Sequence, residues 1–220
     1  MKLQAVFWDF DGVVLDSVDV KTRAFARMFR AYGPEVEKAV VDYHLAHGGI
    51  SRFEKFRHYY SELLNKPVNE AEIKALGDEF SSLVLEEVLA APFIPGALET
   101  LDELLNLRIP AFVVSGTPEE EVRQIVQMRQ LSKYFVEVHG SPRKKVDIVE
   151  DIIVRRGAVP SRCLFLGDAM TDYEAAGKAG VAFIGIVHDI NRSPFPLGTT
   201  IISSVNCNYT YDIVSEHKEK

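Results

Sequence analysis

The sequence predicts an α/β protein with a Rossmann-like core, built on a parallel β-sheet, and an inserted α-helical cap domain. Three observations lead to this fold class. Short apolar runs recur along the chain, helix-type patterns separate most of them, and a long stretch after the first run contains no strand-like segment. The runs contain few polar residues, which is typical of strands that are buried on both faces of a parallel sheet.

Five apolar runs are expected to form the strands of the sheet. They are Gln4–Trp8, Ala111–Val114, Phe135–His139, Cys163–Leu166 and Ala182–Val187. Three helices are expected between the later runs. Thr117 is expected to cap the first, residues 145–156 carry apolar side chains at helical spacing, and Thr171 begins a second T-x-x-E capping pattern. Alternation of strands and helices favours an open parallel sheet.

The segment 17–91 is expected to form the helical cap domain, and residues 1–16 and 92–220 the core. Two groups of apolar residues in this segment recur at helical spacing. They are Phe25, Met28, Phe29 and Tyr32 in the first group, and Ile73, Leu76, Phe80, Leu83 and Val84 in the second. The chain crosses between core and cap near residues 16 and 92, and these crossings are expected to act as a hinge.

Composition narrows the range of partners and of cellular locations. The chain has 220 residues and a net charge of −7, which argues against nucleic acid and anionic membranes as partners. No apolar stretch reaches the roughly 18 residues that a membrane span needs, and the first apolar run has no charged leader typical of a signal peptide. Cys163 and Cys207 lie outside any CxxC pattern. We therefore expect a cytoplasmic protein; no feature indicates an oligomeric state.

Polar residues stand where the predicted strands end, and in open α/β sheets ligands bind beyond the carboxyl ends of the strands. These residues are Asp9 and Asp11 after the first strand, Ser115 and Gly116 after the second, Lys144 and Lys145 ahead of a helix, and Asp168 and Asp172 after the fourth strand. Each alone has an ordinary explanation as a turn, cap or surface residue. Their convergence at one sheet edge indicates a site.

The chemistry of this set favours phosphoryl transfer. Clustered carboxylates raise one another's pKa unless a cation is present, and oxygen ligands of this kind suit Mg²⁺. One carboxylate can attack phosphorus, and a second, two residues farther on, can act as general acid and base. Lys145, Ser115 and the backbone N–H of Gly116 can bind the phosphoryl oxygens. The expected partner is a small phosphorylated metabolite.

Four motifs resemble those of the haloacid dehalogenase superfamily of phosphotransferases. Asp9–Val13 matches its D-x-D-G-[VT] motif, Ser115 its second-strand hydroxyl, Lys145 its basic motif, and Gly167–Asp172 its acidic motif. Their order and spacing match along the whole chain. A helical cap inserted just after the first motif resembles the phosphoglycolate phosphatase and β-phosphoglucomutase subgroup.

The resemblance implies roles for the acidic residues. Asp9 would be the nucleophile and a Mg²⁺ ligand, and Asp11 the general acid/base that also offers its backbone carbonyl to the metal. Asp168 would complete the metal site, and Asp172 would ligate directly or through water. Dehalogenating and phosphonate-cleaving members lack an acid at the position of Asp11, so its presence favours phosphoesters.

The basic motif leaves two candidates for the lysine that holds the phosphoryl group together with Ser115. Lys145 is preferred, because Gly-Ser-Pro-x-x-Lys is a spacing found in relatives, and Lys144 is the alternative.

Substrate choice is expected to come from the cap. The stretch His47–Phe56 resembles the loop by which related caps reach the site, so Arg52 could pair with a second anionic group of the substrate. Alternatively, Ser51 and Glu54 form a capping box and Arg52 lies on the surface. Lys21 stands where β-phosphoglucomutases usually carry histidine. An exposed position on a helix is expected for it, and contact with a substrate carboxylate or sugar hydroxyl is the alternative.

These observations favour a Mg²⁺-dependent phosphatase that acts on a small phosphomonoester, such as a sugar phosphate or a phosphoglycolate-like metabolite. A β-phosphoglucomutase-like phosphomutase is the alternative. A non-enzymatic phospho-accepting domain is less favoured. Receiver domains share a carboxylate cluster, a hydroxyl and a lysine, but their lysine comes last, whereas here Asp168 follows Lys145.

Overall fold

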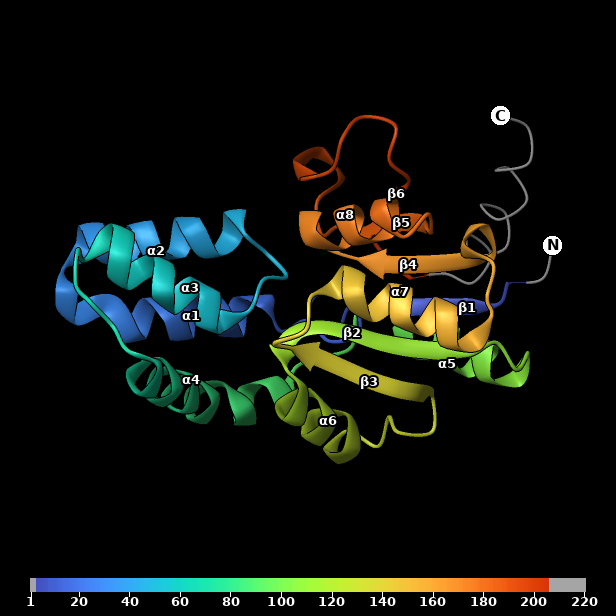
Figure 1. Ribbon diagram of the computed structural model, residues 1–220, viewed down its shortest axis with the longest axis horizontal. Helices are drawn as coiled ribbons and strands as arrows, with labels where there is room; N and C mark the ends of the chain where they lie inside the picture. Colours follow the sequence, from blue (N-terminus) through green and yellow to red (C-terminus); the bar gives the residue numbers. More distant parts are fainter. Residues whose placement is uncertain (1–2, 206–220) are drawn as a thin grey trace.

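The computed structural model describes residues 3–205, which form a six-stranded parallel sheet with helices on both faces and a helical insert at one end (Figure 1). The strand order is β3-β2-β1-β4-β5-β6. The strands are β1 (Ala5–Trp8), β2 (Ala111–Pro118), β3 (Phe135–Ser141), β4 (Cys163–Gly167), β5 (Ala182–Ile186) and β6 (Ile201–Ile202). The predicted fold class is therefore confirmed. Cys207 lies outside the described residues.

The helices fall into two groups along the chain. The helical insert between β1 and β2 contains α1 (Val18–Phe29), α2 (Pro34–Ala46), α3 (Arg52–His58) and α4 (Glu70–Ala90). The sheet is covered by α5 (Ala97–Asn106), α6 (Glu119–Met128), α7 (Lys145–Arg156) and α8 (Met170–Lys178). Figure 1 shows the insert beyond the tips of the arrows of β2 and β3, at the carboxyl end of the sheet.

Alternation along the strands determines which helices cover each face. Phe7 of β1 packs in one cluster with residues of α7 and α8, whereas Val6 and Trp8 pack in another cluster with residues of α5 and α6. Since both faces are covered, the strands β1, β4 and β5 are apolar along their length, as the sequence indicated, whereas the edge strand β3 carries Glu137 and His139.

The sequence missed β6 and placed the start of two helices wrongly. Strand β6 has only two residues, too few for any periodicity. Strand β2 continues to Pro118, so α6 begins at Glu119 and Thr117 is not its N-cap. Helix α8 begins at Met170, so Thr171 lies inside its first turn. Thr117 and Thr171 instead use their hydroxyls in tertiary contacts, described below.

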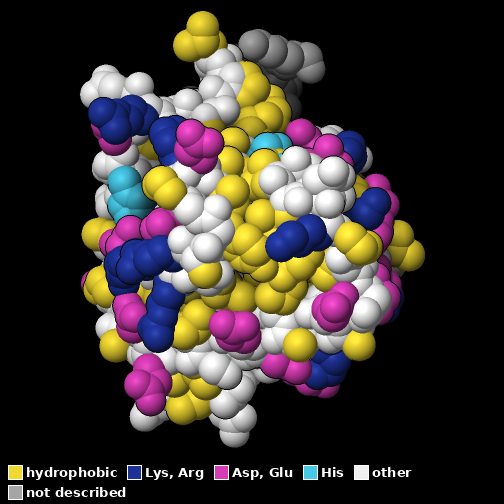
Figure 2. Space-filling view, turned by 90° about the vertical axis from the view of Figure 1, so that its left-hand side faces the viewer, with side chains coloured by type: hydrophobic (Ala, Val, Ile, Leu, Met, Phe, Trp, Pro, Cys, Tyr) yellow, Lys and Arg dark blue, Asp and Glu magenta, His cyan; other side chains and the backbone are white. Residues whose placement is uncertain are grey.

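Aromatic packing holds the helical insert together. Phe25 of α1 and Phe80 of α4 are both buried, and their ring centroids are 4.3 Å apart. Phe29 and Phe56 are also buried in this cluster. Tyr32, although predicted on the same helix face, is 39% exposed, because α1 gives way to a 3₁₀ turn at Arg30–Tyr32. Figure 2 looks onto this end of the molecule, where Lys and Arg side chains lie next to Asp and Glu side chains around a hydrophobic area.

The two chain crossings between insert and core lie side by side. The backbone N–H of Asp16 donates a hydrogen bond to the carbonyl of Pro92 (2.9 Å), and that of Ile94 donates to the carbonyl of Val14 (3.0 Å). Within the part of the chain that the structure describes, no helix is both long enough and apolar enough to span a bilayer.

A buried ion pair joins the insert to the core away from these crossings. The guanidinium of Arg52 in α3 binds both carboxylate oxygens of Glu121 in α6, at 2.6 and 2.8 Å. The Arg52 and Glu121 side chains are only 4% and 10% exposed, and Ser81 of α4 accepts a further hydrogen bond from Arg52 (2.7 Å). A bidentate pair of this kind fixes orientation as well as distance.

We expect Glu121→Ala to destabilise the fold, because it leaves the Arg52 guanidinium buried without its counter-ion. The free energy of unfolding, measured by urea denaturation, should fall by about 3–5 kcal/mol. Glu120→Ala is the matched control, because Glu120 is exposed on the same helical turn; it should change stability by less than about 0.5 kcal/mol. Equal losses in the two variants would contradict this role of the ion pair.

Candidate active site

Asp9 stands directly after β1 and is held by two hydrogen bonds. Its Oδ1 accepts from the backbone N–H of Phe10 (2.7 Å), and its Oδ2 accepts from Nζ of Lys145 (2.7 Å). The residue is only 3% exposed, and its neighbours Trp8 and Phe10 are fully buried. The apolar run thus continues around a carboxylate whose charge is compensated by a lysine from α7.

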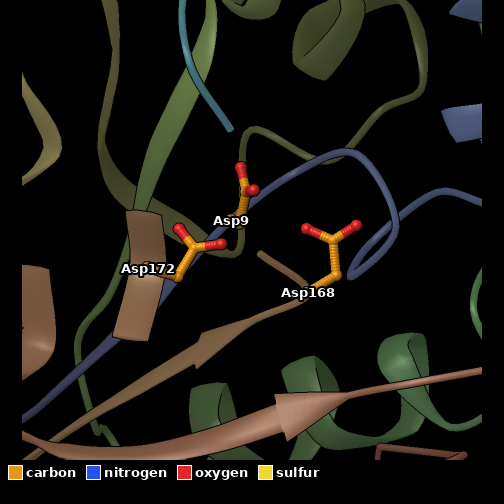
Figure 3. A group of neighbouring side chains, drawn as sticks. All are labelled: Asp9, Asp168 and Asp172. Atoms are coloured by element: carbon orange, nitrogen blue, oxygen red, sulfur yellow. The ribbon is translucent and has the colours of Figure 1, made fainter. Parts of the chain in front are cut away.

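Asp168 and Asp172 bring two further carboxylates to the same place. Asp168 follows β4, and Asp172 lies in the first turn of α8. Figure 3 shows the three carboxylates arranged around a common space, and each offers an oxygen within 4.8 Å of the others. This grouping arises because β1 and β4 are adjacent parallel strands that end at the same edge.

Lys145 joins two of these carboxylates. Its Nζ also donates to Oδ1 of Asp172 (2.6 Å), while Oδ2 of Asp172 accepts from the backbone N–H of Ala169 (3.1 Å). Burial disfavours the Lys145 ammonium, but the carboxylates of Asp172 and Asp9 outweigh it and raise the pKa of Lys145 above its usual value. One buried cation therefore stands among three carboxylates.

The remaining negative charge is uncompensated. Burial, followed by the charges of Asp9 and Asp172, raises the pKa of Asp168 well above its usual range. Burial and the charge of Asp9 likewise raise the pKa of Asp172 to about 7, despite Lys145. Among the described residues, no hydrogen-bond donor is found for the Asp168 carboxylate. An all-oxygen cluster with excess negative charge fits a divalent cation such as Mg²⁺.

Gly12 makes room for this cluster. A Cβ atom at Gly12 would lie 2.3 Å from Oδ2 of Asp168, and the backbone of Gly12 has φ = +78°, which favours glycine. The loop after β1 therefore passes close to Asp168 only because this position has no side chain.

Asp11 binds a set of residues that the sequence analysis did not bring together. Its carboxylate accepts hydrogen bonds from Ser17 (2.6 Å) and Thr117 (2.9 Å) and forms an ion pair with Lys21. Burial raises the pKa of Asp11, but the Lys21 ammonium, its hydrogen bond and those of the two hydroxyls outweigh burial and lower the pKa to about 2. Asp11 is therefore ionised in this arrangement.

The expectation that Lys21 is an exposed helix residue is wrong. Its side chain is 11% exposed and also contacts the Thr117 hydroxyl (2.6 Å). The sequence contained a signal for this contact. Ser17 and Lys21 are four residues apart, so at the start of a helix they lie on the same face and can contact the same carboxylate.

Gly116 lines the cavity over the carboxylates, and Lys145 contacts two of them. Ser115 lines an adjoining pocket together with Gly116 and Lys145, whereas Lys144 is exposed. The Ser115 hydroxyl is buried and accepts from the backbone N–H of Thr117 (3.1 Å). A Cβ at Gly116 would lie 2.4 Å from the carbonyl oxygen of Gly49, so the insert packs directly against this strand end. The Thr171 hydroxyl contributes to the same contact by donating to the carbonyl of Gly48 (3.1 Å).

Arg52 lines the cavity over the carboxylates, but its guanidinium is engaged by Glu121. The cavity has a volume of about 150 Å³ and lies between the core and the insert. Its walls include Asp9, Asp11 and Lys21, together with two further residues that the sequence analysis did not single out, His44 and Lys55.

Comparison with known proteins agrees with this geometry. The family model described as "haloacid dehalogenase-like hydrolase" matches residues 6–186. The chain is 28% identical to a phosphorylated carbohydrates phosphatase of Thermotoga maritima, over 97% of this chain and 99% of the relative. It is 27% identical to a phosphoglycolate phosphatase of Vibrio parahaemolyticus, over 97% of this chain and 94% of the relative.

Solved structures share the fold. β-Phosphoglucomutase from Clostridium difficile superimposes with a TM-score of 0.75 over 98% of each chain, at 16% identity. A haloacid dehalogenase hydrolase from Entamoeba histolytica gives 0.77 over 97% of this chain and all of the other, at 19% identity. The chain therefore belongs to the haloacid dehalogenase-like hydrolase family, and its relatives support its assignment as a phosphatase enzyme.

Proposed function

We propose that the protein is a Mg²⁺-dependent phosphatase that hydrolyses a small phosphomonoester through an aspartyl-phosphate on Asp9. The observation that carries this proposal is the placement of the Asp9 carboxylate: buried at the end of β1, bonded to Lys145, and open to a cavity beside Asp168. The phosphatase names of the relatives support the same class of reaction.

Asp9, Asp168 and the backbone carbonyl of Asp11 would hold the metal ion, with Asp172 as a direct or water-mediated ligand. The ion would neutralise negative charge on the phosphoryl oxygens. Lys145, the Ser115 hydroxyl and the N–H of Gly116 would bind the oxygens on which charge is spread during transfer.

In the first step, an Oδ atom of Asp9 attacks phosphorus, and the bond between phosphorus and the ester oxygen breaks. The phosphoryl group is then on Asp9. Asp11 donates a proton to the departing oxygen, so the leaving group departs as an alcohol. Because the contacts of Asp11 lower its pKa to about 2, this step requires the negative charge of the bound ester to raise that pKa again.

In the second step, the ionised Asp11 removes a proton from a water molecule. The water oxygen attacks phosphorus, the bond from phosphorus to Asp9 breaks, and inorganic phosphate is released. Asp9 is restored as a carboxylate, and Asp11 carries the proton for the next cycle.

Residues 17–91 would act as a cap over this site, with 1–16 and 92–220 as the catalytic core. The hydrogen bond between Asp16 and Pro92 supports a paired hinge. Tight packing of Gly49 on Gly116 supports a closed position of the insert in this structure. Closure would exclude water during the first step.

Purified protein with Mg²⁺ should release phosphate from p-nitrophenyl phosphate and from sugar monophosphates, and EDTA should stop this reaction.

Asp9→Asn should lower kcat by at least about 10³-fold, since it removes the nucleophile. Asp19→Asn, on the exposed side of α1, is the control with near wild-type kcat. If Asp9→Asn retained the wild-type rate with a native circular dichroism spectrum, the assignment of Asp9 as the nucleophile would be wrong. Bisphosphate-dependent exchange between sugar phosphate isomers would instead indicate a phosphomutase.

Alanine substitutions at the two adjacent lysines separate their roles. Lys145→Ala should lower kcat/KM by roughly 10²–10³-fold, because it removes the ammonium that would contact the transferring phosphoryl group. Lys144→Ala should change kcat/KM by less than about threefold, because its side chain is exposed. A larger loss in Lys144→Ala would reverse the assignment.

Lys21→Met should reduce kcat by about 10- to 100-fold, because the carboxylate of Asp11 then lacks the ammonium that positions it. Steady-state kinetics with p-nitrophenyl phosphate measures the effect. Lys38→Met, which replaces an exposed lysine of α2, is the control. An unchanged kcat in Lys21→Met would mean that Ser17 and Thr117 suffice to hold Asp11.

A further inference from the structure

Lys55 of α3 is a buried cation without a carboxylate partner. It is only 3% exposed, and its Nζ contacts Nδ1 of His44 (2.7 Å) and the backbone carbonyl of His44 (3.3 Å). Within the described part of the chain, no carboxylate oxygen lies within 4.0 Å of this ammonium. The Phe25 ring lies near this ammonium, with its centroid 5.7 Å from Nζ, but it is not a counter-ion. Buried charges in proteins are ordinarily paired, so a buried ammonium without a counter-ion needs an explanation.

His44 supplies a second polar group that lacks a partner. Burial and the charge of Lys55 lower the pKa of His44 to about 3, so the ring is neutral. Since Nδ1 accepts from Lys55, the ring proton lies on Nε2, and this atom is buried without a hydrogen-bond partner among the described residues. A buried donor without an acceptor costs free energy, and His44 itself is only 8% exposed.

Both residues line the cavity that also contains Asp9 and Asp11. Asp9 marks the phosphoryl end of this cavity, whereas Lys55 and His44 come from the insert, with Phe25 and Phe80 as apolar walls beside them. The volume of about 150 Å³ has room for on the order of ten water-sized groups, which suits a small leaving group.

The charges around Lys55 do not compensate it. Burial lowers its pKa most, the Lys21 and Lys145 ammonium groups lower it further, and Asp168 and Asp11 raise it; the result is a pKa of about 7. An anion bound beside Lys55 in the cavity would give this ammonium the counter-ion that the described residues do not supply.

We propose that Lys55, positioned by His44, forms an anion subsite for the leaving group, so that the substrate is a phosphomonoester with a second anionic group. This inference rests on the proposed phosphatase function. The second group is a carboxylate or another phosphate, since both present anionic oxygens to an ammonium. Arg52, which the sequence suggested for this purpose, is already occupied by Glu121.

Binding to an inactive background tests the subsite without turnover. Isothermal titration of Asp9→Asn with Mg²⁺ would compare two pairs of ligands that differ in the second anion. Phosphoglycolate and 2-hydroxyethyl phosphate test a carboxylate; fructose 1,6-bisphosphate and fructose 6-phosphate test a second phosphate. In one of the two pairs, we expect the member with the second anionic group to bind about 10- to 100-fold more tightly than its partner.

The preference should disappear when the ammonium is removed. In Asp9→Asn/Lys55→Met the ratio of Kd values should fall below about threefold, and Asp9→Asn/Lys55→Gln provides a second test. Lys74→Met in the same background should retain the preference, because Lys74 is exposed on α4. A preference that is absent in Asp9→Asn, or that survives both substitutions at Lys55, would overturn the subsite. Absence of wild-type phosphomonoester hydrolysis would overturn the proposed function instead.

Thermal stability provides a second readout. The folded-state pKa of Lys55 is about 7, against 10.5 for an ordinary lysine, so its charged form is disfavoured by folding. The penalty is complete below about pH 7 and declines as pH rises toward 10.5. Lys55→Met should therefore raise Tm more at pH 6 than at pH 9. A lower Tm at pH 6 would show that His44, Asp11 and Asp168 already compensate the ammonium despite the opposing charges of Lys21 and Lys145, which contradicts the subsite.

Discussion

The arrangement of the site depends on the ion pairs that the Lys145 ammonium forms with two carboxylates. This ammonium bonds at once to Asp9 after β1 and to Asp172 in α8, and all three groups are almost completely buried. Two carboxylates this close together would repel strongly in a dry environment. A single cation delivered by α7 reduces that repulsion, but the pKa values of Asp168 and Asp172 remain raised. The three carboxylates therefore carry more negative charge than Lys145 compensates, which fits the binding of a further cation.

The helical insert contributes chemistry to the core as well as covering it. Lys21 from α1 and Thr117 from β2 meet on Asp11, so the ionisation of a residue on the core loop depends on the insert. Lys55 and His44 form the far wall of the same cavity. Arg52 also lines this cavity, but its guanidinium anchors α3 to Glu121. Three basic residues of the insert thus make three different kinds of contact, and their local sequence does not distinguish them.

Residues whose sequence pattern is typical of a helix N-cap show how tertiary contacts override local helix-capping preferences. Thr117 precedes a proline and glutamates, a pattern typical of a helix start. However, β2 continues through this position because Pro118 pairs with Ser141 of β3. The hydroxyl then serves Asp11 and Lys21 rather than a helix terminus. At the start of α8, the backbone N–H of Ala169 donates its hydrogen bond to the Asp172 carboxylate and not to the hydroxyl of Thr171.

The sequence by itself determined the α/β class, five of the strands and the position of the insertion, because apolar periodicity reports burial locally. It also placed Asp9, Asp11, Ser115, Lys145 and Asp168 at one sheet edge, since parallel strands bring their carboxyl ends together. Only the tertiary structure decided which basic residues face the cavity. Lys21, Arg52 and Lys55 lie on helices of the insert, and the angle at which that insert meets the core determines which charge each one meets. Such contacts span tens of residues, as between Lys21 and Thr117, and leave no periodic trace in the sequence.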